Sequence, residues 1–222
     1  MLAIALHAIA LAAPREVLVV YYTKSNHTKL LAEAIGNGAR GEPLTNVRVK
    51  ATREAIGDDL IRADAIIIGS PVHFGSQAAE FSRWIETTWT QYWQTGNLTG
   101  KLGAVFTTGG GLAQGLEFVL AELTRRLTHF RIDVVTSDMT WGAGVHSYGA
   151  VAVTGTDPWS DVGAKHASVA KVFLDAGAAL GRSVAQRLAA KRRGGATRRD
   201  AADGGVSVSE MTRCTGAPDE LR

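Results

Sequence analysis

The sequence predicts an α/β domain, built on a parallel sheet with helices on both of its faces. Apolar runs of strand length recur along the chain, segments with helical spacing of apolar residues lie between them, and polar or glycine-rich loops follow three of the runs. Strands that alternate with helices form parallel sheets with right-handed crossovers. At 222 residues, 45% of them hydrophobic, the chain is long enough for one sizeable domain with a buried core.

The first elements are a strand over residues 17–22, a polar turn over 23–28 and a helix that follows it. The unbroken apolar run is typical of a central parallel strand, covered on both faces. Unpaired N–H groups and the helix dipole make the start of such a helix an anion pocket. The turn offers three hydroxyls and no carboxylate, so we expect it to hold a phosphate. The simpler alternative is a plain capped turn, with Thr28 as the N-cap.

The same patterns predict the later elements in order. We expect strands near 47–49 and over 65–69, 102–107, 132–135 and 150–154, helices over 53–62, 77–89, 112–127 and within 161–190, and loops over 70–76, 91–101, 108–111 and 137–149. The domain should therefore occupy residues 15–190. Residues 1–14 precede it as an apolar extension, and residues 191–222 follow it as a basic tail.

The two ends bear on location and partners. Residues 1–13 are apolar apart from His7 and resemble a signal-peptide core, but no Lys or Arg precedes them. We expect a cytoplasmic protein without a membrane span, with export or membrane association through residues 1–13 as the alternative. The tail has few apolar residues and no period, so we expect it to be disordered.

Charge and cysteine content exclude several classes of protein. Seven Lys and Arg and five Asp and Glu lie in residues 191–222, so the tail carries +2 of the formal net charge of +3. A nearly neutral body argues against nucleic-acid binding. Cys214 is the single cysteine, which excludes an intrachain disulfide, a cysteine-ligated metal cage and an iron–sulfur cluster. We expect no metal site.

Three loops follow predicted strands, at residues 23–28, 70–76 and 107–111. Ligands of open parallel sheets bind outside the carboxyl ends of the strands. Neither the Walker spacing nor the G-x-G-x-x-G spacing is present. The second loop contains Pro71 and Gly75, and the third contains Gly109 to Gly111, which allow a flat ring to approach the backbone. A phosphate pocket beside two such walls indicates FMN.

Four stretches resemble the WrbA-type NAD(P)H:quinone oxidoreductases of the flavodoxin-like superfamily. They are ADAIIIGSPVHFGS, LTGKLGAVFTTGGG, LTRRLTHFRIDVV and SYGAVAVTG, and residues 17–34 look like a flavodoxin-like phosphate turn. The resemblance implies a three-layer flavodoxin-like sandwich with a five-stranded parallel sheet in the order 2-1-3-4-5. It also implies FMN as cofactor, NADH or NADPH as co-substrate, two-electron ping-pong reduction of quinones, and a homo-oligomer (dimer or tetramer) whose sites are completed by neighbouring subunits.

The resemblance assigns residues as well. The phosphate would be held by Thr23, Ser25, Asn26, His27 and Thr28, and the flavin ring would be flanked by Pro71, Val72, His73, Phe74, Gly75, Thr107, Thr108, Gly109, Gly110 and Gly111. His129 falls on the family's histidine that reaches the ring from the helix after the glycine loop, which makes it the candidate catalytic residue; a partly buried structural histidine is the alternative. Trp93 lies where the family places an aromatic residue near the flavin pocket, and it is the candidate substrate-binding residue.

Two departures from the family pattern matter. Asn26 replaces the usual glycine of the phosphate turn, and asparagine enters the left-handed region more readily than most residues. The Thr-Gly repeat before the three glycines is contracted, which affects the wall that faces the nicotinamide. Two other functions stay open at this point: an FMN electron carrier of the flavodoxin type, and a flavodoxin-like binding scaffold that has lost its flavin.

Overall fold

The computed structural model describes residues 13–136, 145–146, 148–154 and 168–203, and the chain divides into two compact units, Met1–Leu188 and Ala189–Arg222. The described elements are β1 (Arg15–Tyr21), α2 (His27–Arg40), β2 (Thr45–Ala51), α3 (Gly57–Arg62), β3 (Ala65–His73), β4 (Ser76–Gln77), α4 (Ala79–Thr95), β5 (Leu102–Gly109), α5 (Leu116–His129), β6 (Asp133–Val134), β7 (Val145–His146), β8 (Gly149–Val153) and α6 (Lys171–Asp203). None of the helices in these ranges is long and apolar enough to cross a membrane.

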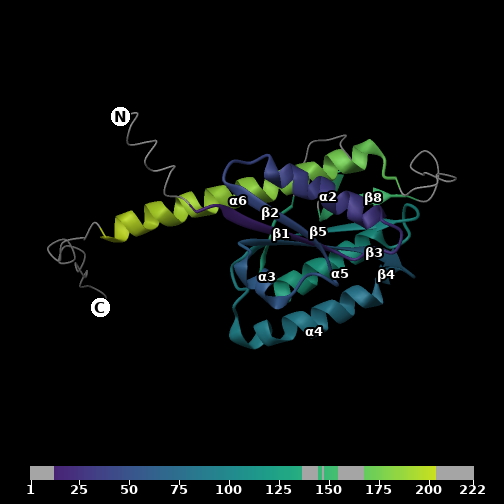
Figure 1. Ribbon diagram of the computed structural model, residues 1–222, viewed down its shortest axis with the longest axis horizontal. Helices are drawn as coiled ribbons and strands as arrows, with labels where there is room; N and C mark the ends of the chain where they lie inside the picture. The colour runs from purple at the N-terminus through teal and green to yellow at the C-terminus, as the bar shows by residue number, and fades with distance from the viewer. Residues whose placement is uncertain (1–12, 137–144, 147, 155–167, 204–222) are drawn as a thin grey trace, which may run out of the picture. The chain divides into compact units, whose positions relative to one another are not determined.

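The sheet confirms the predicted α/β class and strand order. Its strands lie in the order β2-β1-β3-β5-β8-β7, and β1, β2, β3, β5 and β8 pair in parallel. The middle strands are apolar on both faces, with Val17 to Val20 and Ile66 to Ile68 fully buried. In the body of the chain, α2 and α6 cover one face, while α3, α4 and α5 cover the other (Figure 1). This is the three-layer arrangement expected from the sequence.

The fifth sheet position differs from the prediction, because two segments share it. β6 pairs with the start of β5, where Leu102 faces Asp133, and β8 pairs with the end of β5, where Phe106 faces Ala150. The run over 132–135 is therefore only a two-residue strand, and the segment predicted as one more short strand forms the main fifth strand. Most of the loop predicted over 137–149 lies outside the described residues, and so do all of residues 204–222 and most of residues 1–14.

Several predicted boundaries also need correction. The loop over 70–76 is largely a hairpin, since β3 continues to His73 and β4 pairs back on it. α4 continues to Thr95, where Gly96 with a φ of 68° ends it, so residues 91–95 are helix and not connection. α5 begins at Leu116 because Gly115 has a φ of 104°. α6 continues to Asp203, so residues 191–203, predicted to belong to a disordered tail, are helical.

Glycines bring α2 and α6 into close contact within the body. A Cβ built on Gly38 would lie 1.9 Å from the carbonyl oxygen of Ala178, and one built on Gly181 would lie 1.9 Å from the carbonyl oxygen of Ile35. Side chains would therefore hold the two backbones farther apart. Because α2 follows the polar turn directly, this close contact also restrains the position of the turn.

The first prediction concerns this close contact. Replacing Gly181 with alanine should lower the free energy of unfolding in urea by about 1–3 kcal/mol, the usual effect of overpacking. In an open helix the same change would be stabilising by about 1 kcal/mol, so the sign of the effect identifies the steric cause. Arg182→Ala, at the exposed neighbouring position, is the control and should change stability little. A Gly181→Ala protein as stable as the wild type would contradict the close contact.

Candidate functional site

The three predicted loops meet at one edge of the sheet. Tyr21 at the end of β1 lies opposite Gly69 in β3, and Ser70 in β3 lies opposite Thr107 in β5. The Tyr22 N–H donates to the carbonyl of Gly69 at 3.1 Å. Because the three strands are parallel neighbours, the loops that follow them lie side by side, as the sequence predicted.

The first loop has the backbone of an anion pocket. Asn26 is the N-cap of α2 in the left-handed region (φ 69°), as expected from its place in the turn, and its side chain makes no capping hydrogen bond. Thr28 is therefore not the N-cap. The first turn of this 14-residue helix contains no acidic residue that would repel an anion. Its N–H groups and the positive end of its dipole point out of the edge where the loops meet.

The side chains of this loop fit a phosphate. The Thr23 hydroxyl is shielded from solvent and has no hydrogen-bond partner among the described residues. A buried hydroxyl without a partner is unfavourable, so a ligand oxygen at this point would satisfy it. The Ser25 hydroxyl lies 2.9 Å from Nδ1 of His27, so these two predicted phosphate residues hold each other in place.

Buried hydroxyls join the loops to one another. The hydroxyl oxygens of Thr28 and Thr108 lie 2.8 Å apart, and either group can be the donor. The Thr107 hydroxyl donates to the carbonyl of Ser70 at 2.7 Å. Thr28, Thr107 and Thr108 were candidate site residues from the sequence, and Ser70 was not. All four residues are buried. The phosphate loop and the glycine loop are thus parts of one structure.

The second loop is a tight hairpin tip. Phe74 and Gly75 have positive φ values of 51° and 80°, and the Phe74 side chain is fully exposed. A left-handed conformation is uncommon for a bulky residue and is kept only where surrounding contacts impose it. The tip packs on the start of α5, since a Cβ built on Gly115 would lie 2.9 Å from the carbonyl oxygen of Gly75.

The third loop allows close approach, but not equally at its three glycines. Gly109 is buried at the end of β5, where an added Cβ would lie 3.0 Å from Leu116 and 3.2 Å from Val72. A Cβ on Gly111 would lie 2.7 Å from the side chain of Gln114. Gly110 is exposed and has open space around it, with nothing nearer than 3.7 Å. Gly110 is therefore the glycine of this loop best placed to face a flat ring.

A polar cluster that the sequence did not predict lies beside the hairpin. The rings of Tyr22 and His73 meet edge to face at 6.1 Å. Burial, followed by a hydrogen bond with Glu80, raises the pKa of the Tyr22 hydroxyl. The pKa of the Glu80 carboxyl is lowered by its own backbone N–H, by the Tyr22 hydroxyl and by the charges of His73 and Lys24. No motif singled out Tyr22 or Glu80, although Tyr22 directly precedes the first predicted site loop and Glu80 lies in the first turn of the helix after the second.

The structure does not bring Trp93 and His129 to this edge. His129 ends α5, which returns to the start of β5, where the Gly100 N–H donates to the carbonyl of Arg131. Its ring stacks on that of Trp93 at 5.9 Å with the planes 2° apart. Within one chain, these two residues lie at the amino edge of the sheet, opposite the phosphate loop.

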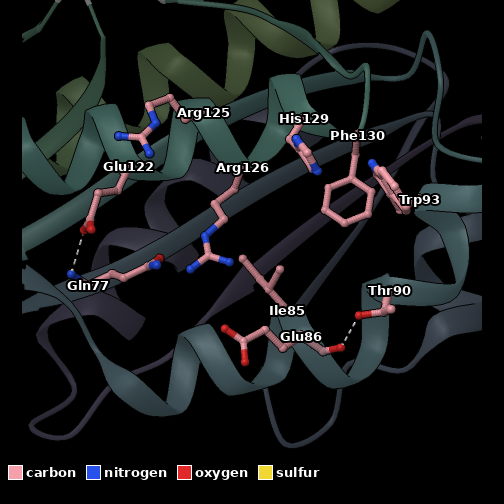
Figure 2. Close-up of a pocket in the computed structure, with 10 residues that line it drawn as sticks. All are labelled: Gln77, Ile85, Glu86, Thr90, Trp93, Glu122, Arg125, Arg126, His129 and Phe130. Carbon is pink, nitrogen blue, oxygen red and sulfur yellow. Dashed lines mark hydrogen bonds between the residues drawn. The ribbon is translucent and has the colours of Figure 1, made fainter.

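The stacked pair closes one end of a cavity between α4 and α5. The cavity has a volume of about 510 Å³, and its lining residues are Gln77, Ile85, Glu86, Thr90, Trp93, Glu122, Arg125, Arg126, His129 and Phe130. Figure 2 shows side chains of the two helices facing each other across it, with Gln77 and Glu122 at the other end. The side chain of Trp93 is 53% exposed, which is unusual for tryptophan.

The fold and the loop geometry define the class of flavodoxin-like proteins. A WrbA-like flavodoxin structure from Agrobacterium tumefaciens superposes with a TM-score of 0.61 at 20% identity, covering 79% of this chain and 98% of that one. A flavodoxin from Aquifex aeolicus is 32% identical over 115 residues, which are 52% of this chain and 61% of the flavodoxin.

The comparisons also identify the family of the chain within this class. The family model for NADPH-dependent FMN reductase matches residues 25–142, and the chain belongs to this family. An NAD(P)H dehydrogenase (quinone) from Rhodopseudomonas palustris strain HaA2 is 31% identical over 170 residues, 64% of this chain and 84% of that protein. These similarities confirm the resemblance to WrbA-type proteins. They support a flavin-dependent oxidoreductase as the general class of this chain.

The second prediction tests the phosphate loop. Ser25→Asp places a carboxylate beside the expected phosphate, and we expect FMN affinity to fall by about 100-fold or more through like-charge repulsion. Ser25→Ala removes the hydroxyl without adding charge and should weaken binding by about tenfold at most. Fluorescence titration of free FMN with each protein measures both values. Equal affinity in the wild type and Ser25→Asp would remove this loop from the site.

Proposed function

We propose that this protein is an FMN-dependent NAD(P)H:quinone oxidoreductase, which reduces quinones to hydroquinones by two electrons in a ping-pong cycle. Thr23 carries the proposal, because its buried hydroxyl has no partner among the described residues and belongs to the loop that leads into a helix N-terminus without a side-chain cap. Membership of the FMN reductase family and relatives named NAD(P)H dehydrogenase (quinone) support the reaction class.

The phosphate end is assigned to the first loop. Thr23, Ser25 and the first-turn N–H groups of α2 would bind the phosphate oxygens, with His27 holding Ser25 in position. Thr28 would act differently from the sequence expectation, because its hydroxyl is already paired with Thr108. Its role is to fix the two loops at a constant spacing, and it contributes its backbone N–H to the pocket.

The ring would lie between the second and third loops. Pro71 to Gly75 form one wall and Thr107 to Gly111 the other, with Gly110 leaving open space. Bound FMN would accept two electrons from reduced nicotinamide and pass them to a quinone. Backbone N–H groups of the loops would stabilise the negative charge that develops on the ring, as preorganised donors do in other sites. Nicotinamide and quinone would use the same ring face in turn.

Trp93 and His129 are assigned to the site of a second copy. Trp93 lies near the end of α4 and His129 at the end of α5, both at the amino edge of their own chain and away from the loops at the carboxyl edge. The exposed Trp93 ring, stacked on His129, is suited to contact a partner. In a homo-oligomer the pair would cover a neighbour's flavin, where the His129 imidazole can hydrogen-bond or protonate a quinone oxygen.

An FMN electron carrier is the second candidate, favoured by the similarity to the Aquifex aeolicus flavodoxin. Carriers of this type usually dock through a strongly acidic face. The body of this chain is nearly neutral, since +2 of the net +3 belongs to residues 191–222. The flavin-less scaffold loses its main argument, because Asn26 adopts the left-handed conformation that the turn requires.

The third prediction separates these functions. Purified protein should be yellow or become so with FMN, and it should oxidise NADH or NADPH in the presence of benzoquinone with parallel lines in double-reciprocal plots. A protein that binds FMN but gives no quinone-dependent nicotinamide oxidation is a carrier. A protein that binds no FMN, even when FMN is added in excess, is a scaffold.

The fourth prediction tests the shared site by complementation. Ser25→Asp should lose FMN, and His129→Ala should lose about 10²-fold in turnover, the usual contribution of a general acid. Coexpressed with different tags and purified through both, the two variants should regain part of the wild-type activity, because some sites then combine an intact loop with an intact His129. Activity no greater than the sum of the separate variants would place His129 outside a shared site.

A further inference from the structure

The hairpin that flanks the proposed flavin ring is held from outside by one carboxylate. Glu122, in the middle of α5, accepts hydrogen bonds from the Ser76 hydroxyl at 2.9 and 3.0 Å and from the Gln77 N–H at 3.0 Å. Figure 2 shows this side chain pointing from α5 to Gln77. Ser76 and Gln77 form β4, the returning strand of the hairpin.

The hydrogen bonds of Glu122 bear on the proposed flavin wall because β4 pairs with the part of β3 that belongs to that wall. In the antiparallel pair, Gln77 lies opposite Val72 and Ser76 opposite His73. Both partners belong to the wall assigned to the flavin, and a two-residue strand has few bonds of its own to fix its position. Hydrogen bonds to an ionised acceptor are shorter and stronger than neutral ones. Glu122 therefore supplies a large part of what holds β4 in place.

The hairpin tip also has a reason to need such an anchor. Phe74 and Gly75 both have positive φ values, and a strained turn persists only when its surroundings impose it. Ser70 fixes the other end of the segment, where its hydroxyl oxygen accepts from the Ala78 N–H at 2.9 Å. Glu122 binds Ser76 and Gln77, which lie in the chain between the hairpin tip and Ala78, and it does so from a different element, α5.

We propose that Glu122 is a positioning residue of the flavin site: its carboxylate sets the place of the β3–β4 hairpin and thereby the contact of residues 71–75 with the flavin ring. The inference rests on the proposed function, since it concerns the same site. It adds a residue that touches neither flavin nor substrate, and that neither the sequence motifs nor the family resemblance pointed to.

The fifth prediction is a double-mutant cycle in the full-length protein, with Glu122→Gln, Ser76→Ala and both together. Each single change should weaken FMN binding by about tenfold, the effect of losing one net hydrogen bond. The double variant should be little weaker than Glu122→Gln alone, because Ser76→Ala removes a bond that Glu122→Gln has already weakened. Glu122→Gln should also shift the visible band and the reduction potential of bound flavin, since the ring wall has moved.

Glu117→Gln is the matched control, an exposed glutamate in the first turn of the same helix. It should leave FMN affinity, flavin absorbance and reduction potential at wild-type values. Hydrogen exchange adds a readout without flavin: the Gln77 amide should exchange faster in Glu122→Gln than in Glu117→Gln.

The outcomes that overturn the proposal can be told apart. If Glu122→Gln lowers the urea midpoint but leaves FMN affinity, spectrum and potential unchanged, the carboxylate is only structural. If the effects of Glu122→Gln and Ser76→Ala on affinity add, the two residues do not act through their shared bond. A wild-type protein that binds no FMN overturns the proposed function together with this inference, whereas FMN bound equally by wild type and Glu122→Gln overturns the inference alone.

Discussion

The direction of the parallel strands is the constraint on which the rest of this structure depends. β1, β3 and β5 are neighbours in register, so their carboxyl ends must deliver three loops to one edge. Each helix that follows a strand must then return to the opposite edge. The same rule that assembles Thr23, Gly75 and Gly110 sends His129 away from them, because it ends α5. In the proposed function, one chain therefore carries two parts of the site on opposite edges.

The sequence was sufficient to predict the loops, because each depends on information close by in the chain. The apolar runs over 17–22, 65–69 and 102–107 gave the strand ends within a few residues, and the ligand edge of a parallel sheet follows from topology. The conformation of Asn26 was also predictable, since few residues other than glycine tolerate that region. What could be predicted was the backbone of the site, together with the residue types that it displays.

The failures share a different cause, which is pairing between distant parts of the chain. Nothing in residues 132–135 or 150–154 says which of them lies beside β5, and the structure divides the position between them. The bond between Thr28 and Thr108 joins residues 80 apart, and Glu122 meets Ser76 at a separation of 46. Other errors were local and avoidable: Gly96 is an ordinary C-terminal helix signal, and it ends α4 at Thr95.

The bond between Thr28 and Thr108 also has a consequence for how a cofactor would enter. The two hydroxyls are bonded to each other inside the protein, so each already has one partner before a ligand binds. The floor of the proposed cofactor site is therefore assembled before anything binds, and little ordering would remain there on association. Thr23 is the opposite case, because its buried hydroxyl has no partner among the described residues. The proposed site thus combines a preorganised floor with one buried hydroxyl that a ligand oxygen would satisfy.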